Sequence, residues 1–218
     1  MRFLTYNIHH AEGVDGRVSV RRVARTVRAL APDVVGLQEV RRGALLGNQP
    51  AALRRRLGLT GPFHPTVRVR GFEFGNLLLT RGSILSTESI ALPSAGAVAR
   101  GCLLAHIELN GARFAVAVTH LGVRQADLPV HLEILAHRLP RSEPLVLLGD
   151  FNALAEALTP LSDLLTFTVG SPPTFPADRP VAAIDLIGFS EHWELTALNA
   201  PSSTVSDHLP LLAELSLT

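Results

Sequence analysis

The chain contains no lysine, and all 20 residues counted as lysine or arginine are arginine. Lysine binds phosphates in the P-loop, contacts ATP in protein kinases and forms Schiff bases with carbonyl substrates. Its absence excludes these three kinds of active site. The sequence also lacks Gly-x-Ser-x-Gly and Gly-x-Gly-x-x-Gly. The first absence argues against a hydrolase with a nucleophile elbow, and the second against a dinucleotide-binding fold.

Cysteine and long apolar runs are also scarce. Cys102 is the only cysteine, so one chain cannot form an internal disulfide, which fits a reducing cytosol. Its apolar neighbours predict a small buried residue. No run of about 18 apolar residues is present, so we expect no membrane span. A strand-like motif starts at residue 5 and leaves no room for a signal peptide, so we expect a cytoplasmic protein.

The chain has one tyrosine and one tryptophan, which offers little surface for stacking nucleic-acid bases. The net charge is only +1, yet residues 1–109 hold 15 arginines against 7 acidic residues. Much of this excess lies in two helix-like segments, 19–31 and 49–58. In the first, Ser19 is the expected N-cap, and an apolar stripe leaves the arginines on the other side. A solvated helix face is favoured over a nucleic-acid groove, and both interpretations remain open.

Length and pattern predict one α/β domain over residues 1–218. A chain of 218 residues with 47% hydrophobic residues is long enough for a single substantial core. Helices are predicted near 19–31, 49–58 and 127–139, with a shorter one near 153–165. Interleaved strands and helices of this kind are typical of α/β proteins. The predicted strands are 2–8, 34–38, 66–70, 75–80, 84–92, 101–109, 113–119, 145–149, 184–188 and 210–217.

Polar residues follow these apolar runs at the points where the strands end. The run Leu145–Leu148 leads directly into Gly149, Asp150 and Asn152, which predicts a central strand with a carboxylate and an amide at its tip. Open sheets place their ligands at such ends. A Gly-Asp-x-Asn segment is also common in turns, so this segment alone does not decide between a site and a turn. Similar clusters containing Asn, Glu, His and Asp occur at the ends of other runs.

Taken together, these clusters resemble the endonuclease/exonuclease/phosphatase family, which includes deoxyribonucleases, abasic-site endonucleases, deadenylases and sphingomyelinases. The segments occur in family order from residue 5 to residue 208. They are Thr5-Tyr6-Asn7-Ile8-His9, Leu37-Gln38-Glu39-Val40, Gly75-Asn76-Leu77-Leu78-Leu79-Thr80, Thr119-His120-Leu121, Gly149-Asp150-Phe151-Asn152, Ile184-Asp185 and Ser206-Asp207-His208. The resemblance implies a four-layer αββα sandwich, in which two packed mixed sheets carry helices on their outer faces.

The resemblance also implies a divalent-metal site. Glu39 is the expected main ligand, with Asn7 beside it and Asp207 completing the cluster. Carboxylate and amide oxygens suit Mg²⁺ or Mn²⁺. A zinc site would need several histidines or cysteines.

The remaining roles concern the phosphate. By resemblance, Asp150 orients or deprotonates the attacking water, and Asn152 holds a phosphoryl oxygen. His208 contacts the phosphate while Asp185 fixes its ring, which would stabilise the cationic imidazole. His120 protonates the leaving oxygen or binds the phosphate. Asn76 is placed near the phosphate by resemblance alone.

Other polar residues are given weaker or structural interpretations. His9 could contact the metal or the phosphate, or have neither role. His10, like His9, is placed between the catalytic and the structural histidines. Glu73 and Arg100 are interpreted as solvated surface residues. The Pro-rich loop 172–180 could help to wall the site. The remaining histidines are interpreted as structural, namely His64, His106, His131, His137 and His192.

The sequence therefore predicts a metal-dependent phosphoesterase that hydrolyses phosphodiester bonds by in-line attack of water. The substrate could be a nucleic acid, a lipid headgroup or a small phosphoester. A phosphomonoesterase is the alternative enzyme, and a non-catalytic binding protein of the same fold is the alternative of another class. We expect a monomer without an obligate protein partner.

Overall fold

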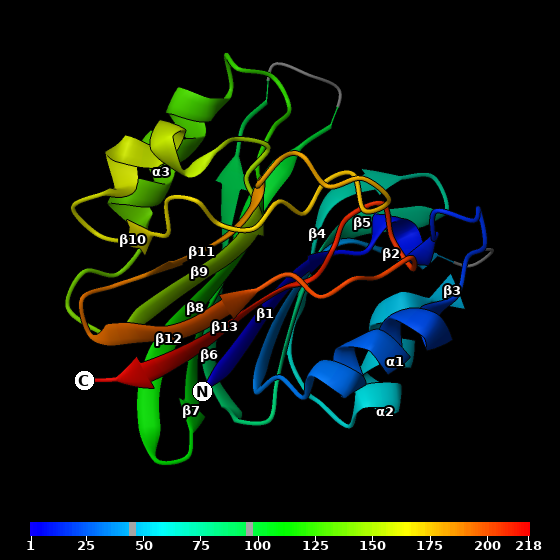
Figure 1. The fold of residues 1–218 in the computed structure, drawn as a ribbon, viewed down its shortest axis with the longest axis horizontal. Coiled ribbons are helices and arrows are strands. Elements are labelled where there is room, and N and C mark those ends of the chain that lie inside the picture. Colours follow the sequence, from blue (N-terminus) through cyan, green and yellow to red (C-terminus); the bar gives the residue numbers. More distant parts are fainter. Residues whose placement is uncertain (44–46, 95–97) are drawn as a thin grey trace.

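Two β-sheets packed face to face form the centre of the molecule (Figure 1). The structure is a computed structural model, and it describes residues 1–43, 47–94 and 98–218. The first sheet has the spatial order β12 (Trp193–Asn199), β13 (Leu211–Leu217), β1 (Arg2–Asn7), β2 (Val34–Gly43), β5 (Phe72–Thr80) and β4 (Phe63–Val69), and β3 (Gly47–Asn48) pairs with β2. The second has the order β10 (Thr166–Phe167), β11 (Asp185–Phe189), β9 (Leu145–Asp150), β8 (Ala112–His120), β7 (Arg100–Leu109) and β6 (Ser83–Leu92).

Helices cover the outer face of each sheet, as Figure 1 shows. The helices α1 (Val20–Leu30) and α2 (Gln49–Leu57) pack on the first sheet, and their apolar side chains form one core with β1, β2 and β5. The helix α3 (Leu128–Arg138) and the 3-10 segment η2 (Ala155–Leu161) cover the second sheet in the same way. The predicted αββα sandwich is therefore confirmed. None of the described helices has the length and apolar content needed to cross a bilayer.

The core between the sheets is built from strand residues that point inward. Phe3 of β1, Phe114 of β8 and Trp193 of β12 meet there in edge-to-face contacts, with ring centroids 5.2 to 5.9 Å apart. Such aromatic pairs stabilise by about 0.5–1.5 kcal/mol beyond the area that they bury. This packing fixes the relative position of the two sheets, and so of the strand ends that each contributes.

The helix α1 follows the pattern predicted from its sequence. Ser19 adopts an extended conformation, and its side chain accepts a hydrogen bond from the Arg22 amide, as expected of an N-cap. Val23 and Val27 are fully buried against the first sheet, while Arg25 is exposed. The arginines of this helix therefore lie on the outer surface of the molecule.

The largest error in the predicted elements concerns residues 153–165. A short helix was expected there, but Ala155–Leu161 forms a 3-10 segment with a non-helical break at Leu158 and Pro160 inside it. Proline lacks the amide that an α-helix needs at that position, which explains the difference. The strands β3, β10 and β12 were not predicted. β12 lies at a sheet edge and is partly exposed, so its sequence lacks an apolar run.

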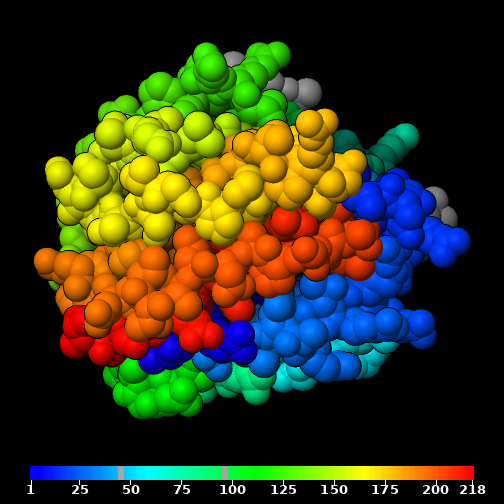
Figure 2. Space-filling view, viewed as in Figure 1, coloured from blue at the N-terminus to red at the C-terminus, as the bar shows by residue number. Residues whose placement is uncertain are grey.

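Strand direction gathers the polar ends on one rim of the sandwich. β1 and β2 run parallel, with Asn7 opposite Gln38, and β8 and β9 run parallel, with His120 opposite Asp150. β11 is antiparallel to β9 and begins at Asp185, directly opposite Asp150. The segments 171–184 and 200–208 lie side by side on the surface (Figure 2), joined by backbone hydrogen bonds such as that from Ala177 to Asp207.

Candidate active site

Asp150 lies at the centre of the site, at the end of β9, with only 1% of its surface exposed. Its Oδ2 accepts a hydrogen bond from Asn7 Nδ2 at 2.9 Å, and its Oδ1 accepts one from the backbone N–H of Asn152 at 3.0 Å. Two imidazoles face the same Oδ2, His120 Nε2 at 3.4 Å and His208 Nε2 at 3.8 Å. One carboxylate therefore joins four residues that the sequence had singled out.

Glu39 lies on β2 at a bulge, in a left-handed backbone conformation with φ of 59°. Such a conformation is uncommon for a residue with a side chain and occurs often at functional sites. Burial raises the pKa of Glu39 above its usual range, and the charges of Asp207 and Asp150 raise it further. The charge of His9 and a hydrogen bond from Asn7 oppose this shift. The structure thus brings Asn7, Glu39 and Asp207 into one cluster.

Two histidines extend this carboxylate cluster. His10 Nε2 lies 3.6 Å from Glu39 Oε2, and His9 Nδ1 lies 3.7 Å from Asp207 Oδ1. Both residues, and Ala11 after them, have positive φ, which holds this turn against the end of β2. Burial lowers the pKa of His10 to about 4. His9 and His10 therefore both contact the predicted metal ligands.

The residues present fit a divalent cation. Carboxylate and amide oxygens from Glu39, Asp207 and Asn7 are the ligands that Mg²⁺ and Mn²⁺ prefer. Ligand atoms of His9, His10 and Glu39 also lie within 4.8 Å of one another, so imidazole nitrogen is available nearby. Burial of several carboxylates together is unfavourable, as the raised pKa of Glu39 indicates, and a cation would relieve it.

His208 is held by a carboxylate on its far side. Its Nδ1 donates to Asp185 Oδ2 at 2.7 Å, and the Thr174 hydroxyl donates to the same oxygen at 2.6 Å. Burial lowers the pKa of His208, but the hydrogen bond and charge of Asp185, with Asp150 and Asp207, outweigh burial and raise it to about 9. The imidazole is therefore cationic at neutral pH, and its Nε2 faces Asp150.

His120 has the opposite electrostatic character. Burial lowers its pKa to about 4, although Asp150 opposes the shift. Arg100 Nη1 donates to His120 Nδ1 at 3.1 Å, which leaves the proton of the neutral ring on Nε2, toward Asp150. One neutral imidazole at the end of β8 and one cationic imidazole in the segment before β13 therefore face the same carboxylate.

Arg100 contacts the candidate site, which the sequence interpretation did not anticipate. It was interpreted as a solvated surface residue, but burial lowers its pKa, and the charges of Glu39 and Asp150 oppose that shift. A signal was present in the β7–β8 hairpin, whose turn at Asn110 and Gly111 sets the register. Counting back from that turn places Arg100 beside the end of β8, where His120 lies.

Asn76 and Glu73 occupy different environments on β5. Asn76 is buried, and its Nδ2 donates to the carbonyls of Gly101 at 2.9 Å and Val118 at 3.4 Å, which links the two sheets. Its predicted phosphate contact stays a prediction and requires one of these bonds to break. Glu73 forms ion pairs with the exposed side chains of Arg42 and Arg68, which agrees with a surface role.

The Pro-rich loop reaches the site through two of its residues. Thr174 supports Asp185, and the Phe175 ring lies against the His208 ring with centroids 4.7 Å apart. Asp178 and Arg179 in the same loop are exposed. Among the remaining histidines, His131 is buried with both ring nitrogens engaged by backbone groups, which fits the structural interpretation.

Comparison with solved structures reveals the same architecture in several bacterial and animal proteins. An endonuclease/exonuclease/phosphatase from Beutenbergia cavernae DSM 12333 has a TM-score of 0.88 at 26% identity, over 100% of this chain and 71% of that one. The mannosyl-6-phosphatase of Bacteroides thetaiotaomicron VPI-5482 has a TM-score of 0.78 at 17% identity, over 100% of both chains. D. rerio TDP2, in complex with a single-stranded DNA product, has a TM-score of 0.76 at 13% identity, over 99% of this chain and 98% of that one.

Sequence comparison is consistent with these structures. Comparison with curated proteins gives no match. The model of the endonuclease/exonuclease/phosphatase family, however, matches residues 4–208, which include all seven segments identified in the sequence. Because that match spans nearly the whole chain, the protein belongs to the endonuclease/exonuclease/phosphatase family.

Proposed function

We propose that this protein is a divalent-metal-dependent phosphoesterase that hydrolyses phosphodiester bonds by in-line attack of water. Members of its family are hydrolases that act on phosphate esters. The observation that carries the proposal is the position of Asp150, which contacts Asn7, His120 and His208 while Glu39 and Asp207 lie beside it. This arrangement joins a water-activating carboxylate, two imidazoles and a set of metal ligands in one place.

The proposed ground-state contacts follow from the hydrogen-bonding groups. Asn152 and His208 contact the phosphoryl oxygens, and Asp150 orients the attacking water and accepts its proton. The cationic imidazole of His208 offsets the negative charge that develops on the phosphoryl oxygens in the transition state. Asp185 positions His208 and maintains its charge, with Thr174 fixing the carboxylate in turn.

His120 and Arg100 act on the other side of Asp150. The neutral His120 ring donates a hydrogen bond from Nε2–H to a phosphoryl oxygen, and Arg100 fixes the ring tautomer that this requires. The Arg100 guanidinium also adds positive charge where a phosphate would bind. Glu39, Asn7 and Asp207 would hold the metal ion, with His9 and His10 adjacent. When bound, that ion supplies Lewis-acid polarisation of the phosphate and lowers the pKa of a coordinated water.

A substrate panel with a matched variant tests the proposal. The panel contains a generic phosphodiester, a monoester, single- and double-stranded DNA, RNA and a phospholipid headgroup, each with Mg²⁺, Mn²⁺ or chelator. We expect metal-dependent diester hydrolysis that Asp150→Asn reduces by about 10³-fold or more while the fold stays intact. Asp163→Asn changes an exposed acid outside the site and should leave turnover unchanged.

The outcomes separate the alternatives. Hydrolysis of the monoester in preference to every diester would favour a phosphomonoesterase at the same site. Near-normal turnover by Asp150→Asn would contradict the assigned roles. Binding to DNA or RNA that weakens steeply with salt would identify a nuclease, because phosphate contacts release counterions. Absence of hydrolysis across the panel would favour a non-catalytic protein.

A further inference from the structure

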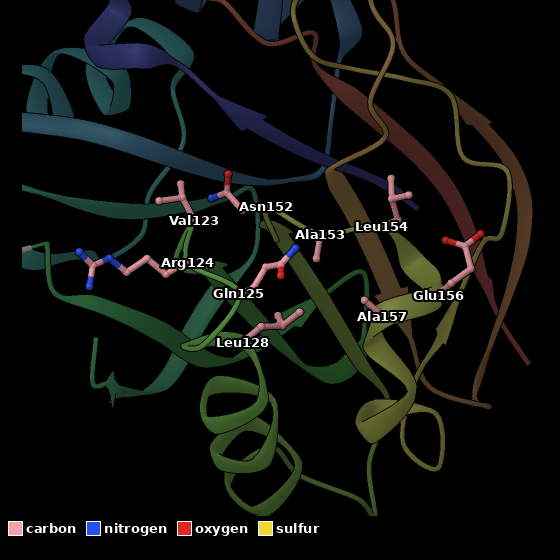
Figure 3. Close-up of a pocket in the computed structure, with 10 residues that line it drawn as sticks. Val123, Arg124, Gln125, Leu128, Asn152, Ala153, Leu154, Glu156 and Ala157 are labelled. Atoms are coloured by element: carbon pink, nitrogen blue, oxygen red, sulfur yellow. The ribbon is translucent and has the colours of Figure 1, made fainter. Parts of the chain in front are cut away.

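A cavity of about 550 Å³ opens directly beside Asn152. Figure 3 shows that its side chains come from two segments that face each other across the cavity, one after β8 and one after β9. Because these strands are parallel and end together at His120 and Asp150, both segments leave the sheet at the proposed phosphate site. Asn152 itself is part of the wall, so the cavity and that site are continuous.

Two interactions hold the walls in place. The Asn152 Nδ2 donates to the Leu121 carbonyl at 3.1 Å, which ties the segment after β9 to the segment after β8. Beneath the cavity, Leu132 of α3 and Leu158 of η2 are buried in the core under the second sheet. Leu128 and Ala153 pack against this core from the cavity side. The cavity therefore has a fixed floor.

The cavity lining is mainly apolar, and several of its apolar side chains are exposed to solvent instead of being buried in the core. Val123 is 71% exposed and Leu154 is 51% exposed, and both line the cavity. Ala157 is also exposed and lies on the same wall. Large exposed apolar side chains around a concave site are a frequent sign of ligand binding. The charged lining residues, Arg124 and Glu156, have opposite signs, and the Arg124 side chain extends away from the other side chains in Figure 3.

From this geometry we infer that the cavity binds an uncharged apolar group, aromatic or branched aliphatic, that is attached to the phosphate of the substrate. The inference rests on the phosphate site proposed above and names the substrate class for it. A small organic phosphoester with such a substituent places its phosphate at Asn152 and its apolar group between Val123, Leu128 and Leu154. A polynucleotide fits less well, because a wall with balanced charge does not attract a polyanion.

The test uses two phosphonates that cannot be hydrolysed, so it does not depend on turnover. Phenylphosphonate and methylphosphonate share the anionic group and differ only in the apolar substituent. We expect isothermal titration calorimetry in the presence of Mg²⁺ to give phenylphosphonate a Kd at least about tenfold lower, since burial of the ring removes apolar surface from water. Ala157→Phe fills the cavity and should reduce the ratio of the two Kd values to about one.

Thr159→Phe is the matched control, because Thr159 is exposed on the same 3-10 segment and does not line the cavity. It should keep the ratio of the original protein. Equal affinity of the original protein for both phosphonates would overturn the inference, as would an equal ratio in the Ala157→Phe and Thr159→Phe variants. Binding of single-stranded DNA that Ala157→Phe abolishes would also overturn it. If neither phosphonate binds, the phosphate site fails, and the inference fails with it.

Discussion

At the scale of single residues, the most specific prediction concerns the pKa of His208 and its dependence on Asp185. Asp185→Asn keeps the shape of the partner but removes the charge that raises the pKa of His208 to about 9, so that pKa should fall. We expect kcat to fall by about 10²- to 10⁴-fold, as when a carboxylate that orients a catalytic histidine is lost. NMR titration of the His208 ring measures the pKa directly. An unchanged pKa would show that Asp185 does not control the charge of His208.

The same pair predicts a dependence of stability on pH. The pKa of His208, about 9 in the folded protein, lies above the value of about 6.5 expected in the unfolded chain. The stabilisation from the cationic ring is therefore complete below about pH 6.5 and is lost as the pH rises through about 9. Urea unfolding between pH 6 and pH 10 should reveal this loss in the original protein and a smaller one in Asp185→Asn. Parallel curves would contradict it.

Arg100 yields a second prediction at this scale. Arg100→Met removes the donor that fixes His120 and the positive charge near Glu39 and Asp150, so kcat/KM for a diester should fall by about 10- to 100-fold. Arg113→Met is the control, because Arg113 lies at the far end of β8 in an exposed pair with Glu108. Arg100→Lys should restore part of the activity through its charge. If Arg100→Met and Arg113→Met had the same kcat/KM, Arg100 would be a surface residue without a role in the reaction.

Single residues also reveal how far the sequence predicts a site. Asn7, Glu39 and Asp150 were identified because each ends an apolar run inside a recognisable segment, and His208 because its segment directly precedes the last apolar run. The position of Arg100 was missed because its contact with His120 depends on hairpin register and three-dimensional packing, which no local pattern around the first residue of β7 reveals. Asn76 was identified by resemblance, yet its amide is used between the sheets, which no local pattern reveals.

At the scale of elements, helix α1 can be tested without disturbing the site. Ser19→Ala removes the side-chain acceptor for the Arg22 amide and should reduce the free energy of unfolding by about 1 kcal/mol. Activity should not change, because α1 covers the outer face of the first sheet. Urea denaturation measures the loss, and Ser202→Ala at an exposed loop position is the control. A loss of activity without a loss of stability would place α1 in the functional surface.

Elements with strong local signals were predicted well, and those fixed by tertiary contacts were not. The apolar stripe and cap of α1 are local, and so is the unbroken apolar run of β9. β12 has partly exposed residues and is a strand because β13 provides its hydrogen-bond partner. In η2, the apolar pattern predicted a helix, but Pro160 lies inside the segment and the chain forms a 3-10 helix.

At the scale of the whole molecule, Cys102 reports on cooperative unfolding. The residue is fully buried, as predicted, and burial raises the pKa of its thiol to about 12. Because the thiolate is the reactive form, the native protein should resist thiol reagents and react only when it opens. The rate of labelling by a thiol reagent should therefore rise in parallel with global unfolding in urea. Rapid labelling without urea would contradict this packing.

The central claim also concerns the whole molecule, because Asn7, Glu39 and Asp207, which are far apart in the sequence, must converge to hold one cation. Thermal unfolding in Mg²⁺, Mn²⁺ or chelator, with the original protein, Glu39→Gln and the exposed control Glu194→Gln, tests it most directly. We predict that a divalent cation at about 100 times its Kd stabilises the original protein and Glu194→Gln by about 2.7 kcal/mol. Glu39→Gln should lose most of that stabilisation. Melting temperatures that do not respond to metal or chelator in the original protein would contradict the account.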